Sequence, residues 1–308
     1  MVGHAKRKIP SCKSAARFGR RENMRNLIIY DGPSAIDGAP IVAILTGLAN
    51  VTRNAGTGDM LQLYIIRSDI MPEVARHTGA DAAICGDCPM RGRVVSLQEA
   101  RDIAEILPAK QRAQLRKRIK TAQNKGQDTI NIERACYVIV SQAPTIIFKA
   151  YKRGLYCEAT PEQAAQYVNG LALRIGAYGD SAALPIGVVE PLADAADTVT
   201  NYTHSGCYDM TRAKQLAQFT MLSADNLEQA ERYWKSGART FRVSSDWTLI
   251  DGVRRVNDIS DGESQCPKTI SKRVTCETCG VCDGLKRGIK SSIVAPSHGN
   301  GAAYHAAL

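Results

Sequence analysis

The sequence has no hydrophobic run long enough to cross a membrane and no recognisable secretory signal. Its longest apolar stretch, around Pro40 to Ala49, is far shorter than the roughly 20 residues that a spanning helix needs. The basic N-terminal segment is not followed by an apolar signal core. We therefore expect a cytoplasmic protein without a membrane partner.

Signatures of nucleotide-dependent enzymes and serine hydrolases are also absent. The chain has no phosphate-binding P-loop, no dinucleotide-binding glycine fingerprint and no nucleophile elbow. Aromatic residues make up only 6% of the chain, so a series of rings for stacking on bases is not expected. Function must therefore be sought in other residue types.

Cysteine is the residue type that stands out. Ten cysteines occur among 308 residues, and the cytosol keeps thiols reduced. We therefore expect metal or iron–sulfur sites rather than disulfides. The hydrophobic content of 44% suits one large domain, or one domain with a smaller appendage.

The strongest cysteine motif lies near the C-terminus. Cys266, Cys276, Cys279 and Cys282, the four-cysteine group, have the spacing C-x9-C-x2-C-x2-C. This spacing lets four thiolates reach one centre, and Gly280 permits the tight turn between them. A 4Fe-4S iron–sulfur cluster is the preferred interpretation, with tetrahedral zinc as the alternative and four unrelated buried thiols as the interpretation without a metal.

A second motif combines a CxxC pair with a distant cysteine. Cys85, Cys88 and Cys136 form this three-cysteine group, and Cys136 lies 48 positions after Cys88. Three thiolates leave one position open, as a reactive cluster or a catalytic zinc requires. The alternatives are a structural site completed by Cys157, Cys207 or a histidine, and a simple CxxC redox pair.

The order of strand and helix patterns predicts an α/β fold. Short apolar runs in residues 26–68 predict a small N-terminal β-sheet. The capping-box spacing of Ser96 and Glu99, followed by Pro108, predicts a helical hairpin inserted at residues 97–128. Later segments predict parallel strands at 135–142, 171–179 and 198–204, and helices at 144–153 and 191–196. Asp225 is expected to cap a further helix, in a sheet that is open or closed into a barrel.

Four regions are expected along the chain. They are a flexible basic arm (1–25), a β-rich part (26–84), an α/β barrel-like core with the helical insertion (85–265), and a cysteine-rich segment with the tail (266–308). Gly179 and Asp180 follow one predicted strand of the core, and His204 ends the next. Ligands bind at such strand ends in α/β folds, so these three are candidate cofactor-binding residues, with capping or packing as the alternative.

The net charge of +10 comes from two short segments. Residues 1–25 hold eight Lys or Arg and one Glu, and residues 110–125 hold seven Lys or Arg and no acid. Such segments contact polyanions through phosphates, although a charged helix face is often only solvated. Arg116, Lys117, Arg118 and Lys120 are the candidate nucleic-acid-binding residues.

The order of these motifs resembles that of a divergent radical S-adenosylmethionine enzyme. The resemblance implies a partial (β/α) barrel and an iron–sulfur cluster on the three-cysteine group. It also implies a methionyl-binding role for Gly179-Asp180-Ser181 and an auxiliary cluster on the four-cysteine group. The radical enzymes usually hold three cysteines in one short CxxxCxxC loop, and Ser181 replaces the expected proline.

From residue 26 onward the chain is also similar to uncharacterised bacteriophage proteins, in the segments LIIYDGP, CGDCP, YKRG, GAYGD and CETCG. This similarity implies the cytoplasm of an infected bacterial host as the location. The preferred hypothesis is a phage-type iron–sulfur protein, with S-adenosylmethionine as a candidate cofactor if it is an enzyme. The competing hypotheses are a non-catalytic nucleic-acid-binding protein with structural zinc or iron–sulfur sites, and a structural zinc protein that binds an acidic protein.

Overall fold

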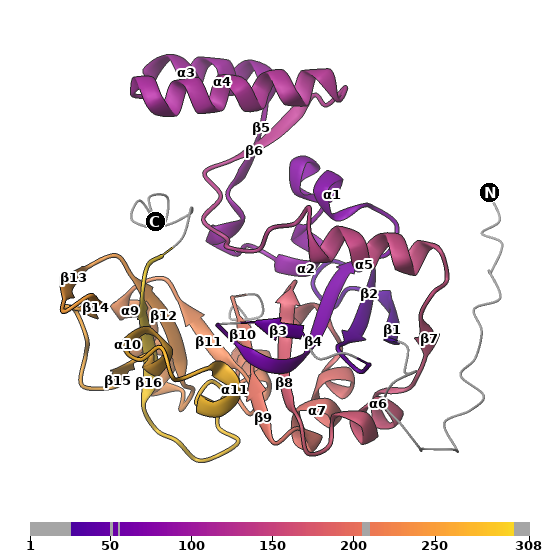
Figure 1. Cartoon of the computed structure of the whole chain (residues 1–308), viewed down its shortest axis with the longest axis vertical. Coiled ribbons are helices and arrows are strands. Elements are labelled where there is room, and N and C mark those ends of the chain that lie inside the picture. Colours follow the sequence, from indigo (N-terminus) through magenta and orange to yellow (C-terminus); the bar gives the residue numbers. More distant parts are fainter. Residues whose placement is uncertain (1–25, 50–51, 55, 205–209, 299–308) are drawn as a thin grey trace.

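Two open sheets, helices around them and a projecting helical hairpin make up the protein (Figure 1). The computed structural model describes residues 26–49, 52–54, 56–204 and 210–298. The fold is mixed α/β with a series of parallel strands, as the sequence predicts. Within these ranges the strands form no closed barrel.

The first sheet has seven strands in the order β7-β1-β2-β4-β8-β9, with β3 paired to β4. The antiparallel strands β1 and β2 contribute mostly buried aliphatic residues, and β4, β8 and β9 run parallel to one another. The bounds are β1 (Leu27–Pro33), β2 (Pro40–Thr46), β3 (Thr52–Asn54), β4 (Gly58–Arg67), β7 (Cys157–Glu158), β8 (Ala172–Tyr178) and β9 (Thr198–Thr200).

The second sheet has five strands, all parallel, in the order β10-β11-β12-β16-β15. Only Asn201 separates β9 from β10, so the chain passes directly from one sheet to the other. The bounds are β10 (Tyr202–Thr203), β11 (Met221–Ala224), β12 (Thr240–Ser244), β15 (Glu263–Gln265) and β16 (Ser292–Pro296). The exposed hairpin of β13 (Trp247–Ile250) and β14 (Val253–Val256) precedes β15 and was not expected from the sequence.

The helices pack mainly beside these sheets. Those of the core are α1 (Pro72–Thr78), α2 (Ala82–Cys85), α5 (Ala143–Lys152), α6 (Pro161–Val168), α7 (Ile186–Ala195), α8 (Met210–Leu216) and α9 (Leu227–Lys235). Short turns are η2 (Pro89–Arg91), η3 (Ser181–Ala183), α10 (Pro267–Ile270) and α11 (Cys276–Cys279). None of the helices in the described ranges has the length and apolar character that a bilayer crossing needs.

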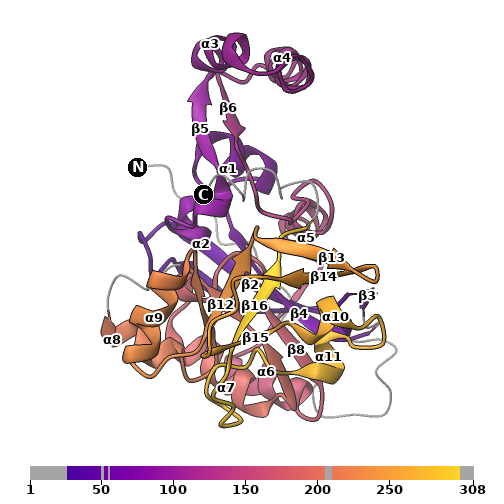
Figure 2. The ribbon, with the colours of Figure 1, turned by 90° about the vertical axis from the view of Figure 1, so that its left-hand side faces the viewer.

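The predicted helical insertion is confirmed. α3 (Leu97–Ile106) and α4 (Ala109–Asn124) stand on a two-stranded ribbon of β5 (Arg93–Ser96) and β6 (Thr129–Ile132). Ser96 caps α3 by accepting a 3.0 Å hydrogen bond from the Glu99 backbone N–H. Both views show the hairpin standing clear of the two sheets (Figures 1 and 2). It has its own small core of buried aliphatic and alanine side chains, which includes Leu115, Ile119 and Ile130.

Three expectations differ from the structure. The N-terminal strands form no separate sheet, because β4 pairs in parallel with β8 and they share one hydrophobic core. Residues 135–142 are a loop rather than a strand, because they connect the β5–β6 ribbon to α5 and their backbone bonds the neighbouring turns. The helix expected at 191–196 begins earlier, at Ile186, and contains Pro191.

Candidate metal centres

The carboxyl ends of parallel strands bring the candidate residues to one edge of the sheets. The CxxC segment follows β4 through α1 and α2, Asp180 follows β8, and His204 follows β10 directly. Asp225 follows β11. In α/β proteins this edge is where chemistry is usually located, because loops after successive parallel strands converge there.

The structure brings the three-cysteine group together across the helical insertion. Cys85 ends α2, and the backbone N–H of Cys88 donates to its carbonyl oxygen at 3.2 Å. The backbone N–H of Cys136 donates at 2.9 Å to the carbonyl oxygen of Met90, in the turn after Cys88. Burial raises the pKa of Cys85 and of Cys136, and the charges of neighbouring thiols act in the same direction. The backbone contacts therefore bring the three cysteines into one region of the structure.

His204 joins this group from the other sheet. Its Nδ1 lies 3.2 Å from Sγ of Cys88, and its Nε2 lies 3.1 Å from Oδ1 of Asp225. Burial alone would lower the pKa of His204, but the hydrogen bonds to Asp225 and Cys88 outweigh burial and raise the pKa to about 10. The imidazole is thus held between a thiol and a carboxylate.

Asp180 holds the backbone of this site. Its Oδ2 accepts a 2.9 Å hydrogen bond from the backbone N–H of His204, and its Oδ1 accepts one of 2.9 Å from Ala182. Gly179 has a φ of 82°, and a Cβ there would lie 2.5 Å from the carbonyl oxygen of Ile65 in β4. Gly179 and Asp180, two of the three candidate cofactor-binding residues, thus serve to position the backbone.

Asp225 was predicted to cap a helix and instead contacts His204. The N-cap of α9 is Asn226, whose side chain accepts a 2.9 Å hydrogen bond from the backbone N–H of Gln229. Asp225 lies one residue too early to reach that turn, so its carboxylate is available for the imidazole. The sequence does not indicate this contact, because His204 follows β10 and Asp225 follows β11, and the two meet only through the pairing of these strands.

Two buried hydroxyl groups lie beside the three-cysteine group without a hydrogen-bond partner in the described part of the chain. They are Oη of Tyr178 and Oγ of Ser181. Burial, and secondarily the charge of Cys85, raises the pKa of Tyr178 well above its usual value. Buried hydroxyl groups usually have partners, so these two are polar groups available to a ligand or a water.

The four-cysteine group is held by the short helix α11 and by the strands β15 and β16. Cys266 follows β15, and its backbone N–H donates at 2.8 Å to Val294 in β16. Thr275 and Thr278 form a capping box on α11, which carries Cys276 and Cys279. Gly280 ends α11 with a φ of 61°, the left-handed conformation that the CxxC turn needs.

The four thiols influence one another electrostatically. The pKa of Cys282 is raised to about 12, mainly by burial. The other three thiols also raise this pKa, whereas the hydrogen bond with Tyr202 lowers it. Burial also raises the pKa of Cys266 and of Cys276, with neighbouring thiols again contributing. Cys266 and Cys282 also pack in one small apolar cluster, and Cys276 and Cys279 share the α11 turn.

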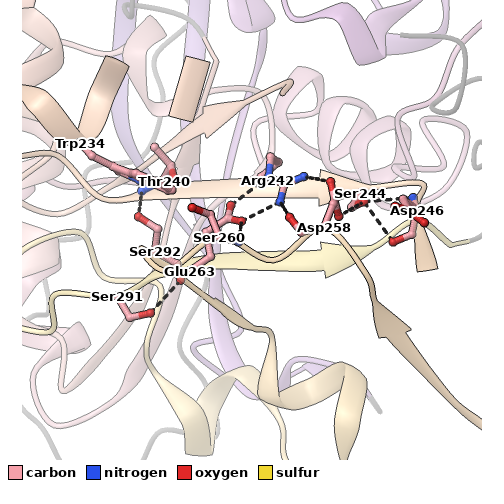
Figure 3. A network of polar contacts seen from close by, with 10 residues as sticks. All are labelled: Trp234, Thr240, Arg242, Ser244, Asp246, Asp258, Ser260, Glu263, Ser291 and Ser292. Carbon is pink, nitrogen blue, oxygen red and sulfur yellow. Dashed lines mark hydrogen bonds and ion pairs between the residues drawn. The ribbon is translucent and has the colours of Figure 1, made fainter. Parts of the chain in front are cut away.

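Buried arginines fix the backbone around this group. Arg239 is almost fully buried and bonds Asp283 and the carbonyl oxygens of Val281 and Ser291. Arg242 on β12 lies between Glu263 on β15 and Asp258 (Figure 3). These ion pairs tie the segments that carry the cysteines to the parallel strands.

The described side chains include no group of three or more Cys, His, Asp or Glu residues closed tightly enough to hold a metal ion. The donor sets nevertheless fit the predicted groups chemically. Four thiolates suit zinc or an iron–sulfur cluster, and three thiolates with a nearby imidazole suit the same groups.

The expected additional ligands are distributed differently. Cys157 lies in β7, at the outer edge of the first sheet, and pairs with Leu27 of β1. It therefore does not belong to the three-cysteine group. Cys207, the other cysteine considered for that group, and the basic arm of residues 1–25 lie outside the described residues.

The four candidate nucleic-acid-binding residues lie on α4, and two of them are already engaged. Arg116 pairs with Glu105 of α3 at 2.8 Å, and Arg118 donates to the backbone carbonyl of Asn131. Lys117 and Lys120 are exposed, and within the described residues their ammonium groups make no hydrogen bond or ion pair. These two lysines are the available cations.

Comparison of this chain with protein-family models, characterised proteins and solved structures finds no match.

Proposed function

We propose that this protein is an iron–sulfur protein whose reactive centre is held by Cys85, Cys88 and Cys136. The four-cysteine group would hold an auxiliary cluster. The observation that carries this proposal is the backbone hydrogen bond from Cys136 to Met90, which brings Cys136 back to the CxxC segment across a whole helical hairpin, near the carboxyl edge of the parallel strands. Such an edge is the usual location of catalytic groups in α/β folds.

An iron–sulfur cluster supplies an electron and, where one position is not taken by cysteine, an iron that a small molecule can bind. The protein's part is to hold and orient. The three thiolates are the ligands, Asp180 fixes the backbone of His204, and Asp225 orients its ring. The buried hydroxyl groups of Tyr178 and Ser181 are available to a bound molecule.

The more specific form of the proposal is a divergent radical S-adenosylmethionine-like enzyme. Its support is the order of elements, since the CxxC segment follows β4 and Gly179-Asp180-Ser181 follows the adjacent parallel strand β8. The partial-barrel arrangement of that family is likewise proposed from this order. Asp180 departs from the expected role, because its carboxylate already accepts two backbone hydrogen bonds.

Metal analysis tests the proposal. Protein purified without oxygen should be brown and contain iron and acid-labile sulfide. Cys88→Ala should lose part of the iron, whereas the matched control Cys157→Ala should keep all of it, because Cys157 lies in β7. A colourless protein that contains stoichiometric zinc would contradict the iron–sulfur proposal. S-adenosylmethionine should change the electron paramagnetic resonance spectrum if the specific form holds.

A second candidate function is phosphate-directed nucleic-acid binding by the helical hairpin. The observation that favours it is the projection of α4 away from the sheets (Figure 2) together with the free ammonium groups of Lys117 and Lys120. The low aromatic content favours sequence-independent contacts with phosphates over base recognition.

Salt-dependent binding tests this second function. The double variant Lys117→Ala/Lys120→Ala should weaken binding to DNA or RNA and reduce the salt dependence, because fewer counterions are released. The matched control Lys214→Ala/Lys235→Ala removes the same charge from α8 and α9 and should bind normally. Equal binding by the two double variants would show that the hairpin is not the surface that contacts the nucleic acid.

A further inference from the structure

We infer that His204 is the fourth protein ligand of the Cys85/Cys88/Cys136 centre, through Nδ1, and that Asp225 and Asp180 are its positioning residues. This inference rests on the proposed metal centre. It goes beyond that proposal by assigning the position that the three cysteines leave.

The ring of His204 lies next to one of the proposed cysteine ligands. Nδ1 of His204 lies 3.2 Å from Sγ of Cys88. In a tetrahedral shell with a metal–sulfur bond of about 2.3 Å and a metal–nitrogen bond of about 2.0 Å, these two atoms would be about 3.5 Å apart. One zinc ion, or one iron of a two-iron cluster, could therefore bind both atoms after a small outward shift, whereas in a 4Fe-4S cluster each iron takes one protein ligand and the two atoms would have to move farther apart. Cys157, the described alternative, lies at the outer edge of the first sheet.

The other ring nitrogen of His204 has a carboxylate partner. Nε2 of His204 lies 3.1 Å from Oδ1 of Asp225. A carboxylate can only accept, so Nε2 carries the proton and Nδ1 is left with a lone pair when the ring is neutral. Histidines that bind metals commonly donate their second nitrogen to a carboxylate in this way, which fixes the tautomer and the ring orientation.

The backbone of His204 is also held in place. His204 follows β10 directly, and its N–H donates to Oδ2 of Asp180 at 2.9 Å. The other oxygen of Asp180 is bound by the backbone N–H of Ala182. The ligand is therefore held from two sides, by Asp225 on the ring and by Asp180 on the main chain.

This assignment has a consequence for the site. With His204 bound, the resting centre has four protein ligands and no open position. A small molecule that binds the metal must displace the imidazole, which would then stay beside the site on its hydrogen bond to Asp225. The histidine would keep the centre closed until such a molecule arrives.

Nitrogen coupling to the reduced cluster tests the assignment. Protein labelled with 15N-histidine should show a 15N coupling in pulsed electron paramagnetic resonance spectra. The coupling should disappear in His204→Cys, which retains four possible ligands, and should persist in the control His298→Gln at an exposed position. Asp225→Ala should lower the affinity for the metal about 10- to 100-fold.

The outcomes separate the two proposals. Iron and sulfide without histidine coupling would overturn the assignment of His204 and leave the iron–sulfur proposal intact. Zinc in place of iron would overturn the iron–sulfur proposal. X-ray absorption at the zinc edge would then still decide the ligand, because a nitrogen scatterer lost in His204→Cys supports the assignment and an unchanged spectrum contradicts it.

Discussion

The backbone N–H of Cys136 donates a 2.9 Å hydrogen bond to the carbonyl oxygen of Met90, across the whole helical insertion. This contact closes the insertion at its base, next to the CxxC pair. The antiparallel partners Ser96 and Thr129, at the far ends of β5 and β6, are likewise adjacent. The hairpin can thus be long without separating the three thiols.

Replacing residues 97–128 by Asn-Gly should therefore leave the core folded. Ser96 and Thr129 already face each other in the ribbon, and Asn-Gly favours the two-residue turn that joins such strands. Iron content and cooperative unfolding should be retained, while nucleic-acid binding should be lost. Loss of iron in a variant that still unfolds cooperatively would show that the hairpin itself supports the centre.

Removing one ligand of the four-cysteine group should affect metal and stability together. Cys279→Ser should lower the metal content and the melting temperature, because structural metal binding contributes folding free energy. Cys157→Ala is the control, since it should lower the melting temperature through lost packing without loss of metal. An unchanged metal stoichiometry in Cys279→Ser would contradict the four-cysteine centre.

Arg239 should be one of the most important residues for stability. Its replacement by Met leaves the buried carboxylate of Asp283, among the described side chains, with its ion pair to Arg287 alone, and we expect a loss of about 3 kcal/mol in the free energy of unfolding. Arg287→Met removes the more exposed partner and should cost less than about 1 kcal/mol. Urea titrations of both variants measure the difference, and equal losses would contradict the argument.

His77 should make stability depend on pH. Burial, followed by the charges of Arg76, Arg118 and other cations, lowers the pKa of His77 to about 4, from 6.5 in the unfolded chain. As the pH falls, the unfolded chain therefore binds a proton at His77 before the folded chain does. The contribution of neutral His77 to the free energy of unfolding is complete above pH 6.5 and is lost as the pH falls towards 4. After allowance for solvent screening, we expect a loss of about 1 to 2 kcal/mol.

The control is His77→Gln, which cannot titrate. Denaturant titrations between pH 7 and 4 should show a shallower loss of stability in this variant than in the parent chain. Parallel curves would show that other groups cause the acid sensitivity.

The sequence by itself determined the local features. Ser96 indicated the start of α3, because its hydroxyl accepts a hydrogen bond from a backbone N–H only three residues later. The spacing of the four-cysteine group is local in the same sense, since a CxxC turn on α11 brings two thiols together whatever the rest of the chain does.

Tertiary structure alone decided the composition of the other site. Cys136, His204 and Asp225 come from three separate segments, and only pairing of the β5–β6 ribbon and of successive parallel strands brings them to Cys88. The pairing of β4 with β8 is likewise non-local. A pattern in the sequence records which face of a strand is buried, but it does not record which strand lies beside it, because many strands offer the same apolar surface.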